Sequence, residues 1–295
     1  MEVEFSQTDS NSAIVRDIDQ EDGEDEFAVS VYAADVYENM MLKERREPYR
    51  PEYLDDHTEI TENMRGILLD WLVDVNVKFR LSQETLFLTQ AVIDRFLSKD
   101  TSIRKKHLQL VGISAMLLAS KFEEIYPPEI RDCIFYSRNI YTADEIRQME
   151  AHILATLDFN ICMVTPTQFM KRFCKASASS PLVHLTATYF LELSLVDLGA
   201  LSFFPSELAA GSIFLAQQVI GQGTWDATAI HYTKQQVPGC LRAAAYLLEL
   251  ARTAKSERAT LHAVFRKYAN KKYSQVAKVS LSRFQLNYLG FQPEA

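Results

Sequence analysis

The sequence lacks features that mark several common classes of protein. It has four cysteines in 295 residues, and no two of them form a Cys-x-x-Cys pair. Neither a disulfide framework nor a zinc finger is therefore predicted. We expect reduced cysteines that serve as small core residues, which places the chain in the nucleus or the cytoplasm. No apolar run approaches the roughly 18–20 residues of a membrane span, and the first ten residues do not resemble a secretory signal.

Motifs for catalysis, phosphate binding and metal binding are also missing. There is no Gly-x-x-x-x-Gly-Lys loop and no His-Glu-x-x-His motif, and no two of the six histidines are four residues apart. Glu123 and Glu124 are adjacent, so on a helix they point in different directions and make a poor acid–base pair. We therefore expect a binding or scaffold protein without enzymatic activity, metal or cofactor. A helical enzyme with an unrecognised site is the least favoured alternative.

The main part of the chain has no excess of positive charge. Residues 1–30 contain ten acidic residues and one basic residue, Arg16, whereas residues 31–295 contain 29 acidic and 30 basic residues. A body that bound nucleic acid would carry a clear basic excess, so a nucleic-acid partner is not expected. The acidic tail, residues 1–28, has too little apolar surface to offset its ordering entropy and is predicted to be disordered.

Helical periodicity dominates from residue 61 onward, and no convincing run of alternating β-branched residues indicates a strand. Capping residues such as Ser82, Thr142 and Thr165 mark several helix starts. The predicted helices cover residues 30–44, 61–80, 82–99, 105–122, 129–136, 142–157, 166–176, 181–197, 205–220, 236–252 and 256–269. The fold class is therefore all-α, with two bundles of about five helices preceded by a short N-terminal helix.

These helices suggest a division of the chain into consecutive parts. After the acidic tail comes the N-terminal helix with its linker, residues 29–60, in which two prolines indicate irregular structure. The first helical domain is expected over residues 61–163 and the second over residues 164–285. A short tail, residues 286–295, ends the chain.

The helix over residues 61–80 is apolar on nearly all sides, which predicts a central helix surrounded by others. Arg65 falls inside its apolar arc, and a buried arginine requires an acidic partner. Asp94, on the next predicted helix, is the favoured partner in a structural ion pair. The alternative is an Arg65 that lies at the surface beside solvent.

Several strings resemble the cyclin family. Residues 64–74 (MRGILLDWLVD) resemble the opening of the cyclin box, and residues 94–98 (DRFLS) and 119–128 (ASKFEEIYPP) resemble further parts of it. Residues 78–86 (KFRLSQETL) and 221–225 (GQGTW) resemble the B-type, mitotic branch. The resemblance extends over roughly residues 30–285. It implies two tandem five-helix cyclin boxes and a regulatory subunit that activates a cyclin-dependent serine/threonine kinase in cell division.

The resemblance also implies which residues bind the kinase. Lys121 and Glu150 resemble the pair that hydrogen-bonds the kinase main chain around its mobile C-helix. The other implied kinase-binding residues are Phe122, Glu124, Leu154 and Phe159 in the first box and Tyr32 and Val36 on the N-terminal helix. The alternative for Lys121 and Glu150 is an intramolecular surface salt bridge, which contributes little to stability.

A second implied surface binds substrates or inhibitors that contain an Arg-x-Leu sequence. Apolar pockets would hold the leucine and an acidic residue would face the arginine. The implied residues are Met64, Ile67, Leu68, Trp71, Asp74, Leu108 and Gln109. Each apolar member could instead simply belong to the core, since the same helix is expected to be central. The remaining rival for the whole chain is a transcription factor of the cyclin fold that binds DNA or other proteins.

Overall fold

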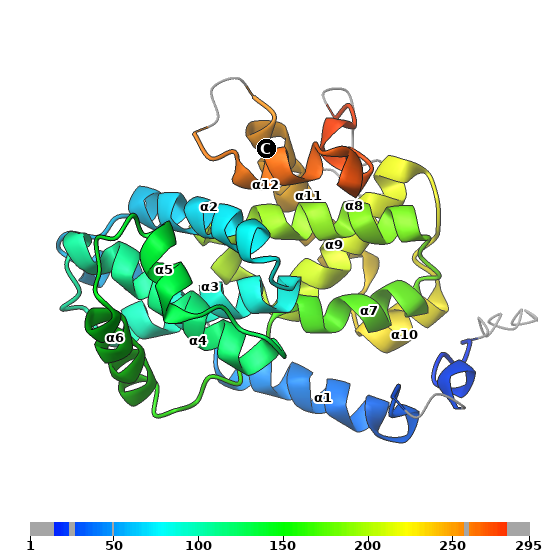
Figure 1. The fold of residues 1–295 in the computed structure, drawn as a ribbon. Coiled ribbons are helices and arrows are strands. Elements are labelled where there is room, and N and C mark those ends of the chain that lie inside the picture. The colour runs from blue at the N-terminus through cyan, green and yellow to red at the C-terminus, as the bar shows by residue number, and fades with distance from the viewer. Residues whose placement is uncertain (1–14, 24–26, 49, 257–259, 282–295) are drawn as a thin grey trace, which may run out of the picture.

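The computed structural model describes residues 15–23, 27–48, 50–256 and 260–281, and every regular element in these ranges is helical. Figure 1 shows two groups of helices side by side, α2–α6 and α7–α11, with α1 running along one side of the molecule. This confirms the predicted all-α fold with two five-helix units after an N-terminal helix. The helices are α1 (Ser30–Arg46), α2 (Glu62–Phe79), α3 (Gln83–Lys99), α4 (Leu108–Glu123), α5 (Ile130–Tyr136), α6 (Ala143–Thr156), α7 (Pro166–Ala176), α8 (Pro181–Leu193), α9 (Pro205–Ile220), α10 (Ala227–Thr233), α11 (Val237–Ala254) and α12 (Ala263–Tyr268).

Side-chain caps explain why many helices begin where the sequence predicts. The Ser82 hydroxyl accepts a hydrogen bond from the Thr85 amide at the start of α3. Thr142 and Glu145 form a reciprocal capping box at the start of α6. These bonds satisfy amides that have no partner within the helix, so the local sequence alone places both helix starts.

The central helix of the first unit is α4 and not α2, so the prediction that residues 61–80 form the surrounded helix is wrong. Residues 110–120 of α4 are all buried, whereas Ile67 and Val77 of α2 are exposed. The physical reason is the distribution of charge: residues 108–120 of α4 include no charged side chain, whereas α2 carries Asp70, Asp74 and Lys78. Gly112 lets Leu68 of α2 approach so closely that a Cβ at Gly112 would lie 2.7 Å from Leu68 Cδ1.

Arg65 and Asp94 form the predicted ion pair. Arg65 Nε lies 2.7 Å from Asp94 Oδ1 and Nη2 lies 2.7 Å from Oδ2, and both side chains are almost completely buried. Tyr53 donates its hydroxyl to the same carboxylate at 2.7 Å. Arg65 Nη1 also donates to the carbonyl of Leu195 at 3.2 Å. One buried arginine therefore joins α2, α3 and the second helical unit.

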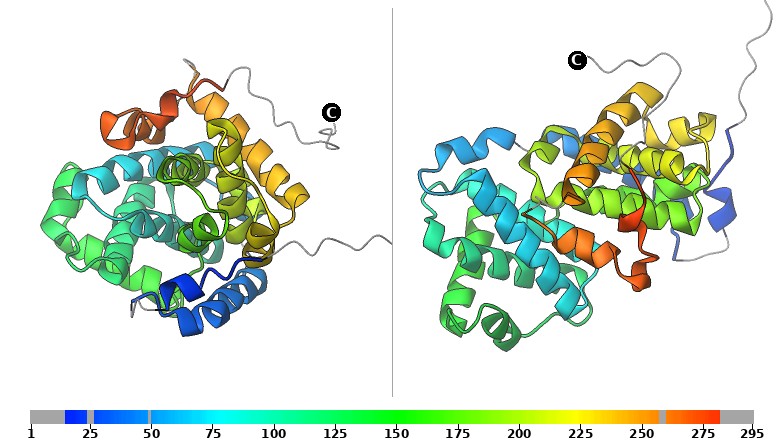
Figure 2. Two further views of the ribbon diagram at one scale, coloured as in Figure 1. Left: turned by 90° about the vertical axis from the view of Figure 1, so that its right-hand side faces the viewer. Right: turned by 90° about the horizontal axis from the view of Figure 1, so that it is seen from above.

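The structure differs from the prediction for part of the acidic tail. Residues 15–23, the darkest blue part of the chain in Figure 2, lie beside α1 at the edge of the second unit. Ile18 in this segment is fully buried. The composition of this tail did not indicate an ordered segment, because a single apolar residue provides its anchor. Residues 1–14 of the predicted disordered tail and the predicted tail over residues 286–295 lie outside the described residues.

Three smaller predictions also need correction. Helix α10 was not predicted, and α12 begins only at Ala263, because residues 260–262 are not helical. The predicted irregular linker contains a short 3₁₀ helix, Pro51–Asp56, which buries Tyr53 and Leu54. Three of the four cysteines are buried as expected, but Cys162 is exposed.

Candidate functional site

The predicted pair Lys121 and Glu150 is brought together at the edge of the first unit. Lys121 ends the buried run of α4, and Glu150 lies on α6, which packs against α4. Lys121 Nζ lies 2.6 Å from Glu150 Oε1, with side chains 48% and 10% exposed. The free chain thus forms the intramolecular salt bridge that was the alternative interpretation. Half of the lysine side chain remains accessible to a second protein.

Exposed apolar side chains lie close to this pair in the sequence, on α4 and just after α6. Phe122, at the end of α4, is 50% exposed, and Phe159, just after α6, is 72% exposed. Leu154 on α6 is partly buried and packs against the core. Exposed aromatic groups next to a polar pair are typical of a protein-binding surface rather than of a solvated face.

Sequence reasoning missed three strongly exposed apolar residues in this region. Ile125 and Tyr126 are almost fully exposed on the loop that leaves α4, and Phe135 is exposed on α5. The signal that could have found Ile125 and Tyr126 is the Tyr126-Pro127-Pro128 sequence. Prolines end the helix there, so the apolar residues before them fall on a loop with no helix face to bury them.

Glu124 has an intramolecular role. Its Oε1 accepts hydrogen bonds from the Ser82 amide at 2.7 Å, the Ser82 hydroxyl at 2.8 Å and the Thr85 hydroxyl at 2.5 Å. Burial opposes ionisation of this carboxyl, but the hydrogen bonds from Thr85 and Ser82 outweigh it and hold its pKa below the usual value. Glu124 therefore fixes the start of α3 to the end of α4, and its contact with a partner stays a prediction.

The two predicted kinase-binding residues of α1 share its outer face. Tyr32 and Val36 are four residues apart and both exposed. The opposite face is anchored, since the Tyr37 hydroxyl donates to the Gln168 carbonyl at 3.1 Å and Glu44 is buried. Helix α1 thus presents a short apolar stripe away from the body.

The predicted docking residues divide into exposed and buried sets. Ile67 is exposed, and Met64, Trp71, Asp74 and Gln109 are partly exposed. Leu68 and Leu108 are buried. These two leucines therefore serve the core in this structure, as the alternative interpretation allowed for the apolar members.

The acidic member of this docking patch already has a basic partner. Arg266 of α12 places Nη2 2.5 Å from Asp74 Oδ2, and the Ala263 amide donates to Asp70 Oδ1 at 2.8 Å. In Figure 2, orange α12 crosses cyan α2 in the view from above. Sequence reasoning missed Arg266, because residues about 190 positions apart give no local signal.

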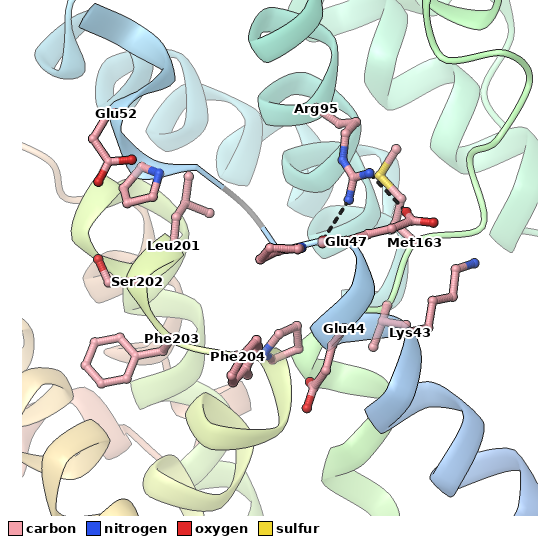
Figure 3. A pocket seen from close by; sticks show the side chains of 14 residues that line it. Lys43, Glu44, Glu47, Glu52, Arg95, Met163, Leu201, Ser202, Phe203 and Phe204 are labelled. Atoms are coloured by element: carbon pink, nitrogen blue, oxygen red, sulfur yellow. Dashed lines mark hydrogen bonds and ion pairs between the residues drawn. The ribbon is translucent and has the colours of Figure 1, made fainter.

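A pocket of about 290 Å³ lies where the end of α1 meets both helical units, and Figure 3 shows its lining. Its polar groups are used within the chain: Arg95 Nη1 lies 3.0 Å from Glu47 Oε2, and both Glu44 carboxylate oxygens accept hydrogen bonds from Ser206. Burial raises the pKa of Glu44. These contacts bind α1 to the start of α9 and give the pocket a structural role.

Within the described ranges, no cluster of three or more His, Cys, Asp or Glu side chains could hold a metal ion. Among the same residues no helix is both long and apolar enough to span a bilayer.

Comparisons with known proteins agree with this architecture. The cyclin N-terminal domain matches residues 35–162, and the cyclin C-terminal domain matches residues 164–282. The G2/mitotic-specific cyclin-B1 of Oryzias latipes is 39% identical over 276 residues, covering 94% of this chain and 68% of that protein. Cyclin-B2-4 of Arabidopsis thaliana is 40% identical over 276 residues, covering 92% of this chain and 63% of that protein.

A solved structure supports the fold independently. The viral cyclin from Herpesvirus saimiri has a TM-score of 0.67 at 22% identity and covers 73% of this chain and 96% of that one. The two tandem five-helix units, each matched by one of the two cyclin domains, define the class of protein. The chain belongs to the cyclin family, and the relatives named above carry the B-type names that the sequence strings predicted. It spans about two thirds of the length of these two relatives.

Proposed function

We propose that the chain is the regulatory subunit of a cyclin-dependent serine/threonine kinase and acts in entry into or progress through mitosis. The observation that carries this proposal is the Lys121–Glu150 pair at the surface, with exposed Phe122 next to Lys121 on α4 and exposed Phe159 just after α6. The names of the B-type relatives supply the mitotic context. Such a subunit would act where its kinase acts, in the nucleus, the cytoplasm or both.

The chemistry of this edge suits a partner helix with accessible main-chain groups. Lys121 is held 2.6 Å from Glu150, so a donor and an acceptor stand ready at fixed positions. A bound kinase would bury both between the neighbouring phenylalanines, where hydrogen bonds gain strength from the exclusion of water. Binding activates a kinase only to the extent that the subunit prefers the active position of the C-helix over the inactive one.

The binding test compares three forms of the chain by titration calorimetry against a purified cyclin-dependent kinase. Lys121→Ala/Glu150→Ala should weaken binding by about 2–4 kcal/mol, because main-chain groups of the partner lose their hydrogen bonds in a desolvated interface. The matched control, Glu249→Ala/Arg252→Ala, removes an exposed ion pair on α11 and should bind as the wild type does. Equal affinities for all three forms would reject this edge as the kinase-binding surface.

We further propose that the patch on α2 docks substrates or inhibitors with an Arg-x-Leu sequence. Ile67 and Trp71 offer accessible apolar surface, and Asp74 offers a carboxylate that holds an arginine side chain in the free protein. The pairing with Arg266 shows that this carboxylate can accept a guanidinium. Binding of a labelled Arg-x-Leu peptide, and its loss in Asp74→Asn, would test the assignment.

A further inference from the structure

An acidic segment of the N-terminal tail is bound like a peptide ligand to the second helical unit. Residues 16–22 pass over α7 and α10, and Ile18 is 0% exposed although charged or polar residues surround it in the sequence. Arg16 adds a hydrogen bond from Nη2 to the Lys175 carbonyl at 2.7 Å. One apolar anchor and a rim of polar contacts are typical of short peptide recognition.

The acidic side chains of the segment match basic side chains of α7 in register. Asp19 Oδ1 and Oδ2 lie 2.5 and 2.7 Å from the two terminal nitrogens of Arg172, and Asp22 Oδ1 lies 2.7 Å from Lys175 Nζ. The short 3₁₀ turn Gln20–Asp22 places Asp22 three residues after Asp19 on one face. Arg172 and Lys175 are also three residues apart on one face of a helix. The acidic residues of the segment and the basic residues of α7 therefore share a three-residue spacing, so both ion pairs form at the same time.

Main-chain donors of the segment match hydroxyl groups of α10 in the same way. The Arg16 amide donates to Thr228 Oγ1 at 3.1 Å, and the Ile18 amide donates to Tyr232 Oη at 3.3 Å. Two residues of extended chain advance about 6.6 Å, and one helical turn advances about 5.4 Å. Alternate amides of an extended peptide can therefore reach hydroxyls four residues apart on a helix.

The receptor side of this contact is preorganised by the body of the protein. The Arg172 guanidinium lies between two aromatic rings, 4.9 Å from the centroid of Tyr37 on α1 and 5.0 Å from that of Tyr232. Its side chain is 9% exposed. The bond from Arg172 holds the pKa of Asp19 below its usual value. A fixed arginine fork is suited to bidentate recognition of a carboxylate.

We propose that the face formed by α7 and α10 is a peptide-docking site for the pattern Ile-Asp-x-x-Asp, occupied in this structure by residues 16–22 of the same chain. A partner protein that carries the same pattern binds there in place of the tail. A tethered segment competes at an effective concentration in the millimolar range. The site is therefore closed to weak partners and opens when the tail is displaced. This proposal does not depend on kinase binding.

The test measures binding of a fluorescent peptide with the sequence of residues 15–23 to the full-length chain by anisotropy. In the variant Ile18→Ser/Asp19→Asn, which releases the tail, the peptide should bind at least about ten-fold more tightly than in the wild type. A further Arg172→Lys change should weaken binding again, because lysine keeps the charge but loses the fork. Unchanged thermal unfolding of these variants shows that the body stays folded.

Two peptide variants separate specific docking from general attraction of acidic peptides. The Asp19→Asn peptide should lose about ten-fold or more in affinity. The Asp17→Asn peptide carries the same charge change and should bind normally, because the hydrogen bonds that Asp17 accepts within the described residues come from the amides of Asp19 and Gln20 in the segment itself. Equal losses for both peptides would overturn the proposal. So would absence of binding to the tail-released variant at millimolar peptide.

Discussion

The buried pair between Arg65 and Asp94 permits the most quantitative prediction. Replacing Asp94 with alanine removes the only acidic partner that the structure gives Arg65 and leaves its guanidinium buried. Breaking one side of a buried ion pair costs about 3–5 kcal/mol. Replacing Arg65 with methionine should cost a similar amount, because the Asp94 carboxylate then keeps only uncharged donors such as Tyr53.

The same figures give an expected change in melting temperature. Unfolding entropy near 60 °C is about 2.1 cal/mol/K per residue, or about 0.6 kcal/mol/K for this chain. Each single substitution should therefore lower the melting temperature by about 5–8 °C. The Arg65 change also removes the bond to the Leu195 carbonyl. We expect the Arg65 substitution to weaken the contact between the two helical units, which would broaden the thermal unfolding transition.

A double-mutant cycle provides the decisive assay, read by urea unfolding at neutral pH. Arg65→Met/Asp94→Ala combines the two single substitutions and removes both charges, so its cost should fall short of the sum of the singles by about 2–3 kcal/mol. Arg252→Ala, in an exposed pair, should change stability by less than about 0.5 kcal/mol. Additive single effects, or single effects below about 1 kcal/mol, would refute the reasoning.

Three further predictions concern other contacts. Glu124→Gln should cost about 1–2 kcal/mol at neutral pH, and the difference should vanish as the pH falls through the lowered folded-state pKa of Glu124, since ionisation stabilises the fold only above it. Arg266→Ala should strengthen binding of an Arg-x-Leu peptide several-fold by freeing Asp74, and unchanged or weaker binding in anisotropy would count against the docking patch. Gly211→Ala should destabilise the fold by about 1–3 kcal/mol in thermal unfolding, because its Cβ would collide with Ala243, and a stabilised variant would contradict that packing.

Local patterns predicted most of the fold. Helix starts at Ser82 and Thr142 depend on side chains within three residues, so sequence alone carries the information. The Arg65–Asp94 pair could also be predicted from the sequence, because a basic residue inside an apolar helical arc requires an acidic partner and Asp94 lies on the next helix. The helix pattern already predicted two bundles, and the family resemblance then identified them as tandem cyclin boxes.

Contacts between residues far apart in the sequence could not be predicted from such local patterns. The close approach of Leu68 to Gly112 depends on how α2 packs against α4, which apolar periodicity does not reveal. The docking of Ile18 depends on complementary groups on α7 and α10, about 150 or more residues away. The same holds for Arg266, whose pairing with Asp74 exists only because α12 crosses α2.

For the candidate site, the sequence predicted that Lys121 and Glu150 would matter, and the structure places them 2.6 Å apart. The structure also gives Glu124 three hydrogen-bond donors from the same chain, and it places Leu68 and Leu108 in the core. A resemblance transfers residue positions, but it does not show which side chains a particular chain uses for its own packing.

We propose that this chain activates a kinase through the edge marked by Lys121 and Glu150. The most direct measurement is the phosphorylation rate of a purified cyclin-dependent kinase titrated with the chain, its Lys121→Ala/Glu150→Ala form and the Glu249→Ala/Arg252→Ala control. We expect a saturable rise in rate with the wild type and the control, and a rise with the Lys121/Glu150 double variant only at much higher concentration. Identical titration curves for all three forms, or no activation by any of them, would contradict it.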